Sequence, residues 1–154
     1  MALEIERKFL VDAEKIAALN LTGGEKIFQG YLSTDKNKTV RVRIKNERGY
    51  LTIKSANIGI VRSEFEYEIP VADAEEILKL CAPKILQKVR YKVEYAGKIF
   101  EVDIFSGKHK GLILAEVELN SATEKIDLPD WLGEEVSENP RYFNSNLVVR
   151  SVVN

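Results

Sequence analysis

The chain begins MALEIERKFLV, and residues 4–8, Glu4-Ile5-Glu6-Arg7-Lys8, decide how the rest of the sequence is interpreted. Three charged side chains, Glu4, Glu6 and Lys8, occupy every second position of this stretch. Successive side chains of a β-strand point to opposite faces, so in a strand these three would share one face. That face is either the solvated side of an ordinary amphipathic strand or one wall of a charged site.

The same two-residue period returns along the whole chain and predicts a mostly β protein. The expected strands are Leu3–Val11, Lys26–Thr34, Thr39–Asn46, Tyr50–Ser55, Val61–Pro70, Ile85–Tyr95, Lys98–Phe105 and Leu112–Asn120. Their short connections predict antiparallel neighbours. Helices are expected after Asp12 and after Asp73, and a short third one near Asn139-Pro140. We expect an α+β fold, mostly β, in a single domain of residues 1–154.

Composition limits the classes of protein that this chain can represent. Its 154 residues suit one domain, and 31% charged with 45% hydrophobic residues is typical of a globular protein rather than a disordered or membrane-spanning one. No apolar run approaches the roughly 20 residues of a transmembrane helix, and Glu4 and Glu6 interrupt any secretory signal, so a cytoplasmic location is expected. The single Cys81 allows no internal disulfide and is expected to be a small buried side chain on a helix. A net charge of -1 gives no reason to expect binding to nucleic acid.

Each expected strand has one apolar and one charged face. Beyond the first strand, the charged faces carry Arg41, Arg43 and Lys45; Thr52 and Lys54; Arg62, Glu64, Glu66 and Glu68; Lys88, Arg90, Lys92 and Glu94; Glu101 and Asp103; and Glu116 and Glu118. The signs are segregated, because the first and eighth strands supply pairs of Glu while the third and sixth supply pairs of Arg and Lys. Two architectures fit: an open sheet with its charged face in water, or a closed barrel of about eight strands with the charges inside. Unpaired buried charges cost several kcal/mol each, so a charged lumen needs water, ions and an anionic ligand.

The motif Glu4-x-Glu6-x-Lys8 resembles the ExExK signature of the triphosphate tunnel metalloenzymes, also called the CYTH superfamily. The resemblance extends over nearly the whole chain, and the chain is most similar to bacterial-type tripolyphosphatases. It includes Gln29-Gly-Tyr31, Arg41-x-Arg43, Lys54, Glu64-x-Glu66, Lys88-x-Arg90, Asp103, Glu116-x-Glu118, Trp131-Leu-Gly-Glu-Glu-Val136, Tyr142 and Asn144. The resemblance implies an eight-stranded antiparallel closed barrel with a few flanking helices, in which a triphosphate is hydrolysed or cyclised with the help of divalent metal.

The resemblance also implies roles for individual residues. The residues expected to bind the triphosphate oxygens are Lys8, Arg41, Arg43, Lys54, Lys88 and Arg90, consistent with the bidentate geometry of Arg and the mobile charge of Lys. Those expected to bind Mg²⁺ or Mn²⁺ are Glu4, Glu6, Asp103, Glu116 and Glu118, since hard cations prefer oxygen ligands.

The expected reaction is in-line attack of metal-activated water on the triphosphate. Glu4 and Glu6 would act in catalysis through the metal, Lys88 would neutralise or protonate the leaving phosphate, and Tyr31 would orient an oxygen. Arg62, Glu64 and Glu66 are possible supporting residues. For the two Glu, ion pairing with the basic side chains and direct metal ligation both remain open.

Short loops and 8% aromatic residues provide no evident platform for an organic group, so inorganic tripolyphosphate is the expected substrate. The alternatives are a thiamine triphosphatase, a nucleoside triphosphatase or an enzyme similar to class IV adenylate cyclase, and, outside enzymes, a polyphosphate-binding module. The expected partners are a small triphosphate and no membrane, with the chain a monomer or homodimer. His109 is expected in a solvated loop, Arg7 on the outer face, and Trp131 packing a short helix against the barrel.

Overall fold

The structure, a computed structural model, describes residues 3–150, and strands dominate it. The strands are β1 (Leu3–Val11), β2 (Glu25–Ser33), β3 (Lys38–Lys45), β4 (Arg48–Ser55), β5 (Val61–Ile69), β6 (Ile85–Tyr95), β7 (Lys98–Phe105), β8 (Ile113–Glu118) and β9 (Leu132–Glu135). The helices are α1 (Ala13–Ala17), α2 (Val71–Cys81) and α3 (Asn144–Leu147), with 3₁₀ turns η1 (Gly107–His109) and η2 (Pro140–Tyr142).

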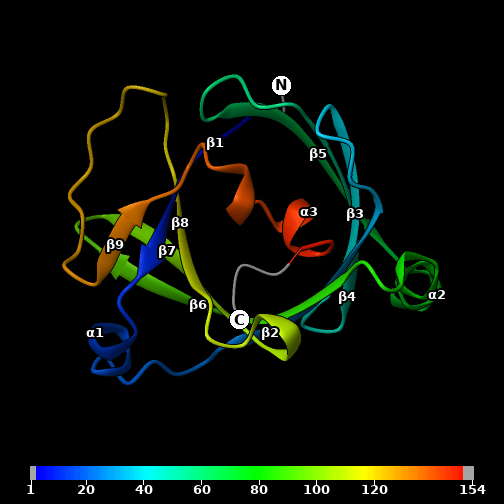
Figure 1. Cartoon of the computed structure of the whole chain (residues 1–154), viewed down its shortest axis with the longest axis horizontal. Helices are drawn as coiled ribbons and strands as arrows, with labels where there is room; N and C mark the ends of the chain where they lie inside the picture. The colour runs from blue at the N-terminus through cyan, green and yellow to red at the C-terminus, as the bar shows by residue number, and fades with distance from the viewer. Residues whose placement is uncertain (1–2, 151–154) are drawn as a thin grey trace.

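The sheet closes on itself because β1 pairs with β8 and also with β5, the strand at the far end of the sheet. Neighbours follow the order β5-β4-β3-β2-β6-β7-β8-β1, and β1 also pairs with β5. Its residues 3–5 face β5, whereas residues 6–10 face β8, so one strand joins both ends of the sheet. Viewed along the barrel, the strands form a ring (Figure 1). The predicted eight-stranded antiparallel barrel is confirmed, with β9 added beside Phe9 and Val11 of β1.

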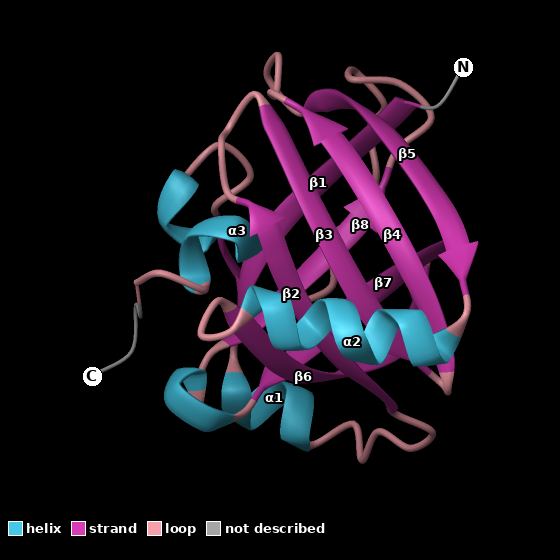
Figure 2. Cartoon of the chain, turned by 90° about the vertical axis from the view of Figure 1, so that its right-hand side faces the viewer, coloured by secondary structure: helices cyan, strands magenta, loops and turns pink. Residues whose placement is uncertain are grey.

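Helices and loops cover part of the apolar outer surface of the barrel, whereas Ile53, Phe65 and Tyr67 on β4 and β5 remain exposed. Helix α2 lies across β2, β3 and β4 (Figure 2) and buries Val42, Ala74 and Cys81. A second cluster packs α1 and Trp131 against the strands around Phe100. The expected placements of Cys81 and Trp131 are therefore observed.

A third apolar cluster fills one end of the barrel. Leu86, Phe105 and Leu114 lie two positions along their strands from Lys88, Asp103 and Glu116, so their side chains also face inward. They pack against Leu147 and Val148 at the C-terminal end of α3. In Figure 1, α3 lies within the outline of the ring. The lumen is consequently charged along part of its length and apolar where α3 enters.

The helices agree with the sequence predictions only in part. Asp12 caps α1 as expected and accepts a hydrogen bond from the Lys15 amide at 3.0 Å. The prediction that α2 follows Asp73 is wrong, because α2 begins at Val71 after Pro70 and places Asp73 in its first turn. An acidic side chain is favourable there as well, since it faces the positive end of the helix dipole. The predicted third helix is split at Phe143 into η2 and α3.

The prediction that His109 lies in a solvated loop is wrong, because this residue is only 1% exposed. Its Nε2 lies 2.7 Å from the carbonyl oxygen of Leu147, and its ring meets the edge of Phe105. The sequence around His109 is polar, but α3 covers it from 38 residues away. Arg7 lies on the outer side as expected, where its guanidinium sits over the Phe9 ring and pairs with Glu135. Within residues 3–150, no helix is long and apolar enough to cross a membrane.

Candidate active site

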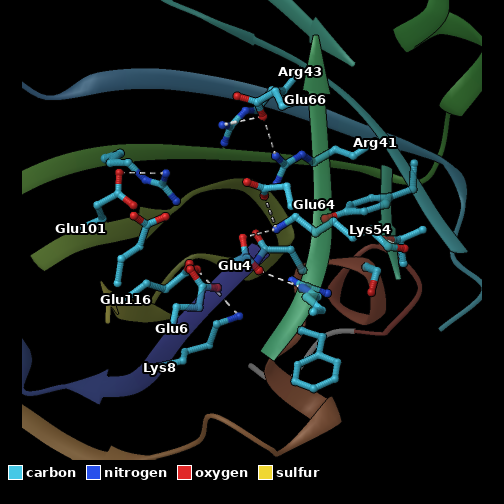
Figure 3. Close-up of a pocket in the computed structure, with 18 of the residues that line it drawn as sticks. Glu4, Glu6, Lys8, Arg41, Arg43, Lys54, Glu64, Glu66, Glu101 and Glu116 are labelled. Carbon is cyan, nitrogen blue, oxygen red and sulfur yellow. Dashed lines mark hydrogen bonds and ion pairs between the residues drawn. The ribbon is translucent and has the colours of Figure 1, made fainter. Parts of the chain in front are cut away.

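The charged part of the lumen is a cavity of about 210 Å³, and charged side chains form most of its wall (Figure 3). Eight basic residues line it: Lys8, Arg41, Arg43, Lys45, Lys54, Arg62, Lys88 and Arg90. Seven carboxylates join them: Glu4, Glu6, Glu64, Glu66, Glu101, Glu116 and Glu118. The remaining lining residues are Tyr31, Thr39, Phe143, Asn144 and Ser145. Of all the site residues predicted from sequence, only Asp103 is absent from this wall.

The alternation in β1 places three charges along the cavity. Glu4 is opposite Arg62 of β5, Glu6 opposite Glu118 of β8, and Lys8 opposite Glu116 of β8. The three side chains point into the cavity together in Figure 3. The opening stretch of the sequence is thus a wall of the site and not a solvated strand face.

Arg41 and Arg43 on β3 form a basic wall that is held by a carboxylate. Glu66 Oε2 lies 3.3 Å from Nη2 of Arg41 and 3.2 Å from Nη2 of Arg43, and it accepts a hydrogen bond from the Thr52 hydroxyl at 2.7 Å. Burial opposes the charge on both Arg43 and Glu66. Together with the positive charge of neighbouring Arg41, it lowers the pKa of Arg43 to about 10. For Glu66 the nearby Arg43, together with Thr52, outweighs burial and lowers its pKa.

Glu4 occupies the centre of a second ion-pair group. Its carboxylate accepts hydrogen bonds from Lys54 Nζ at 2.9 Å and from Arg62 Nε at 2.8 Å. Although burial opposes ionisation, these two cations lower the pKa of Glu4 to about 2. Glu64 also contacts Lys54, at 3.1 Å, while burial and the proximity of Glu4 raise its pKa. The geometry therefore shows both Glu64 and Glu66 in contact with basic side chains.

Glu6 and Glu116 form the acidic part of the wall. Burial, followed by the negative charges of Glu116 and Glu4, raises the pKa of Glu6 well above its usual value. Glu116 is also buried, but Lys8, Arg90 and Lys88 outweigh that burial and hold its pKa well below the usual range. The two neighbouring carboxylates therefore differ, because their surroundings disfavour negative charge on Glu6 and favour it on Glu116. Glu118 is more exposed, and burial together with Glu101 raises its pKa.

Asp103 lies behind the cavity wall, between two of the predicted phosphate-binding residues. Arg90 donates through Nε to Oδ1 of Asp103 at 2.7 Å and through Nη2 to Oδ2 at 2.9 Å. Lys88 Nζ lies 2.7 Å from the same Oδ2. Burial opposes the charge on Asp103, yet Lys88 and Arg90 lower its pKa. Burial also lowers the pKa of Lys88 to about 8, against the opposing effect of Asp103. The arrangement suits Asp103 to positioning Lys88 and Arg90.

Tyr31, on β2 opposite Arg41, reaches the cavity as predicted. Within the described part of the chain, its hydroxyl makes no hydrogen bond, so it is available to a ligand. Sequence reasoning assigned no role to Glu101, which contacts Arg90 at 3.2 Å, although its inward parity was visible. Phe143 and Ser145 were also missed, because no periodicity marks a segment that enters the barrel from outside.

The chemistry of the carboxylates fits a hard divalent cation. Oxygen ligands from Glu6, Glu116 and Glu118 suit Mg²⁺ or Mn²⁺, and a dication would offset the repulsion that raises the pKa of Glu6. Across residues 3–150, no three His, Cys, Asp or Glu side chains already stand in an arrangement that could hold a metal ion. Glu4 in particular is turned toward Lys54 and Arg62.

Comparisons with known proteins agree with this geometry. Residues 2–152 match the CYTH domain family. An inorganic triphosphatase of Acetivibrio thermocellus is 48% identical over 149 residues, which cover 96% of this chain and 94% of that protein. An inorganic triphosphatase of Nitrosomonas europaea is 35% identical, with 95% and 97% of the two chains covered. A crystal structure of an inorganic triphosphatase superposes with a TM-score of 0.67 at 33% identity, covering 97% of each chain. With its family match over almost the entire length and a closed barrel of inward-facing charges, the chain belongs to the CYTH family.

Proposed function

We propose that this chain hydrolyses inorganic triphosphate inside its barrel, in a reaction that depends on a divalent metal ion. The observation that carries the proposal is the cavity wall, in which eight basic side chains and seven carboxylates line one space of about 210 Å³. The similarity to two inorganic triphosphatases over nearly their full lengths supports the same substrate. The whole of residues 1–154 would form this one catalytic domain.

The basic residues provide binding for a polyanion. Lys8, Arg41, Arg43, Lys54 and Arg90 all reach the cavity from different points around the ring. Nε of Arg41 and Nε of Arg43 are buried and have no hydrogen-bond partner among the described residues. Buried donors without partners are costly, and phosphate oxygens are natural acceptors for guanidinium groups.

The acidic residues provide for the metal. Glu6, Glu116 and Glu118, with Glu4 once it is released from Lys54, would hold Mg²⁺ or Mn²⁺. When bound, such a cation neutralises phosphate charge and lowers the pKa of a water that can attack the terminal phosphorus. A polyphosphate-binding module has no need of these four carboxylates, because they weaken the attraction for an anion.

Lys88 and Tyr31 are proposed to act on the reacting phosphates. The ammonium group of Lys88 lies in the cavity wall, and its pKa of about 8 is suitable for donating a proton to the leaving phosphate near neutral pH. The free hydroxyl of Tyr31 would donate a hydrogen bond to a substrate oxygen. Arg62, Glu64 and Glu66 would position the charged residues through their ion pairs.

A second candidate substrate class has one observation in its favour. A neighbouring hollow of about 370 Å³ shares Thr39, Arg62, Phe143 and Ser145 with the cavity. The rest of its lining combines neutral residues, among them Asn37 and Pro140, with the charged Lys36 and Glu138. The hollow has room for an organic group attached to a triphosphate, such as a nucleoside or thiamine. The monomer-or-homodimer state and the cytoplasmic location remain predictions of the sequence.

Phosphate release from equal concentrations of tripolyphosphate, ATP and thiamine triphosphate tests the proposal, with Mg²⁺, with Mn²⁺ and with EDTA. We expect tripolyphosphate to have the highest kcat/KM and EDTA to abolish release. A higher kcat/KM for ATP or thiamine triphosphate would favour the second class. Binding of tripolyphosphate without phosphate release from any of the three would favour the binding module.

A further inference from the structure

The C-terminal segment, residues 137–150, brings Asn144 into the cavity wall from outside the sheet. Leu147 and Val148 are buried in the inward apolar cluster, and the carbonyl oxygen of Leu147 contacts His109 Nε2 at 2.7 Å. In Figure 1, α3 lies within the ring. The backbone of Asn144 is therefore held in place by contacts that do not involve its own side chain.

The side chain of Asn144 connects two strands of the barrel. Its Oδ1 accepts a hydrogen bond from Lys88 Nζ of β6 at 3.0 Å and another from Gln29 Nε2 of β2 at 3.0 Å. An ammonium group can only donate, so the amide oxygen and not the amide nitrogen must face Lys88. The same oxygen then requires the Nε2 side of Gln29. Oε1 of the fully buried Gln29 is left without a partner among the described residues, which shows that the contact with Asn144 determines this amide's orientation.

The hydrogen-bond inventory of Lys88 is then nearly complete. Its ammonium has three N–H donors. Asp103 Oδ2 at 2.7 Å and Asn144 Oδ1 at 3.0 Å can take two of them, and the third remains for a ligand in the cavity that Lys88 lines. One acceptor alone would leave the ammonium free to rotate about that contact, whereas two acceptors define where the third donor points.

We infer that Asn144 is a positioning residue, whose amide oxygen aims the third N–H of Lys88 at the substrate in the cavity. The same helix, α3, therefore closes one end of the barrel and aligns Lys88. The consequence for the reaction rests on the proposed function, whereas the effect on the Lys88 ammonium does not.

Steady-state kinetics with tripolyphosphate at saturating Mg²⁺ tests the consequence for the reaction. Asn144→Ala removes the acceptor, and kcat should fall about ten- to a hundredfold because a reacting group is misaligned, with little change in KM. Asn144→Asp keeps an acceptor in place, so it should recover much of kcat while its added negative charge raises KM. In a Lys88→Gln background, Asn144→Ala should cause little further loss, since a residue that acts through Lys88 has no target there.

Asn146→Ala is the matched control, because it removes an Asn from the same helix. Nδ2 of Asn146 donates to the carbonyl oxygen of Pro140 at 2.8 Å, a contact within the C-terminal segment. Its loss should lower the melting temperature and leave kcat near the parental value. Equal losses of kcat in Asn144→Ala and Asn146→Ala would show that Asn144 only stabilises the segment, and would overturn the inference.

A readout independent of catalysis is the ¹H–¹⁵N NMR signal of the Lys88 ammonium in protein without metal or substrate, assigned by its loss in Lys88→Arg. Asn144→Ala should shift and broaden this signal, whereas Asn144→Asp and Asn146→Ala should retain it. An unchanged signal in Asn144→Ala overturns the inference whether or not the parent is active. Conversely, an inactive parent with the expected NMR changes would contradict the proposed function and leave the positioning of Lys88 supported.

Discussion

Glu6 is a carboxylate whose surroundings in the folded protein oppose its charge. Burial, Glu116 and Glu4 raise its pKa well above the usual 4.5. A group whose folded-state pKa is raised contributes stability that is present at low pH and lost as the pH rises from its unfolded value through the folded one. Without metal, the folded protein is therefore destabilised near neutral pH by a residue that its proposed function requires.

Glu6→Gln should separate stability from function. In EDTA at about pH 8, the variant should melt above the parent, by roughly 2–4 °C for each kcal/mol of relieved repulsion. Near pH 4 the difference should disappear, because Glu6 is protonated in the folded parent and largely so in the unfolded chain. Adding Mg²⁺ should raise the melting temperature of the parent more than that of the variant. Equal melting temperatures at both pH values would show that Glu6 carries no such strain.

Asp103 illustrates the opposite case, a carboxylate on which two buried cations depend. It lies between Lys88 and Arg90 at contact distances of 2.7 Å. Asp103→Asn should cost about 3–5 kcal/mol of unfolding free energy, since removing one partner leaves buried charges uncompensated. Urea denaturation measures this. The control is Glu135→Gln, which breaks the more exposed pair with Arg7 and should cost less than about 1 kcal/mol. A loss for Asp103→Asn as small as that of the control would show that Lys88 and Arg90 do not depend on Asp103 for charge compensation.

Among the elements, α2 shows how the outer layer is fitted to the barrel without touching the site. Gly30 of β2 lies beneath the helix, where an added Cβ would stand 2.6 Å from Cβ of Cys81 and 3.1 Å from a methyl carbon of Leu78. An added methyl group at Gly30 would therefore fit only if α2 moved away from β2. Gly30 is thus required by close packing of α2 against β2.

Gly30→Ala should accordingly cost about 1–3 kcal/mol through overpacking. Because α2 packs on the outside of the barrel, kcat for tripolyphosphate should stay within about twofold of the parent. A twofold change is a small effect on the activation barrier, since a tenfold change in rate corresponds to about 1.4 kcal/mol. Combining it with Cys81→Gly should restore part of the lost stability. Thermal melts and kinetics of the three variants measure both effects, and a large loss of kcat in Gly30→Ala would show that α2 does influence the lumen.

At the level of elements, the sequence predicts the long strands better than the short strand β9 and the C-terminal helix. The bounds of β1, β6 and β7 agree with the periodicity, because each strand is long and alternates without interruption. Strand β9 was not predicted, since its four residues carry only a short pattern and pair with β1 by virtue of the tertiary fold. The split of the predicted third helix at Phe143 was likewise invisible, as it follows from how the segment enters the barrel.

For the molecule as a whole, the sequence predicts which strand faces are charged. It does not predict where along the lumen the charged lining gives way to an apolar one. Alternation alone places Lys88 and Glu116 inside once the sheet closes. It does not reveal that Leu86 and Leu114, on the same inward faces, form an apolar end of the lumen around α3. That end depends on contacts between residues far apart in the chain. For the same reason the burial of His109 and the role of Asn144 required the structure.

The central claim is that the inward-facing charges of this barrel form a metal-dependent triphosphatase site. The most direct measurement is phosphate release from tripolyphosphate by the parent and by Glu116→Gln, with Mg²⁺ and with EDTA. Glu134→Gln serves as a control, because Glu134 is exposed on β9 outside the cavity. We expect release only with metal, a loss of about a hundredfold or more in kcat for Glu116→Gln, and parental kinetics for Glu134→Gln. Release that persists in EDTA, or parental kcat in a folded Glu116→Gln variant, would contradict the account.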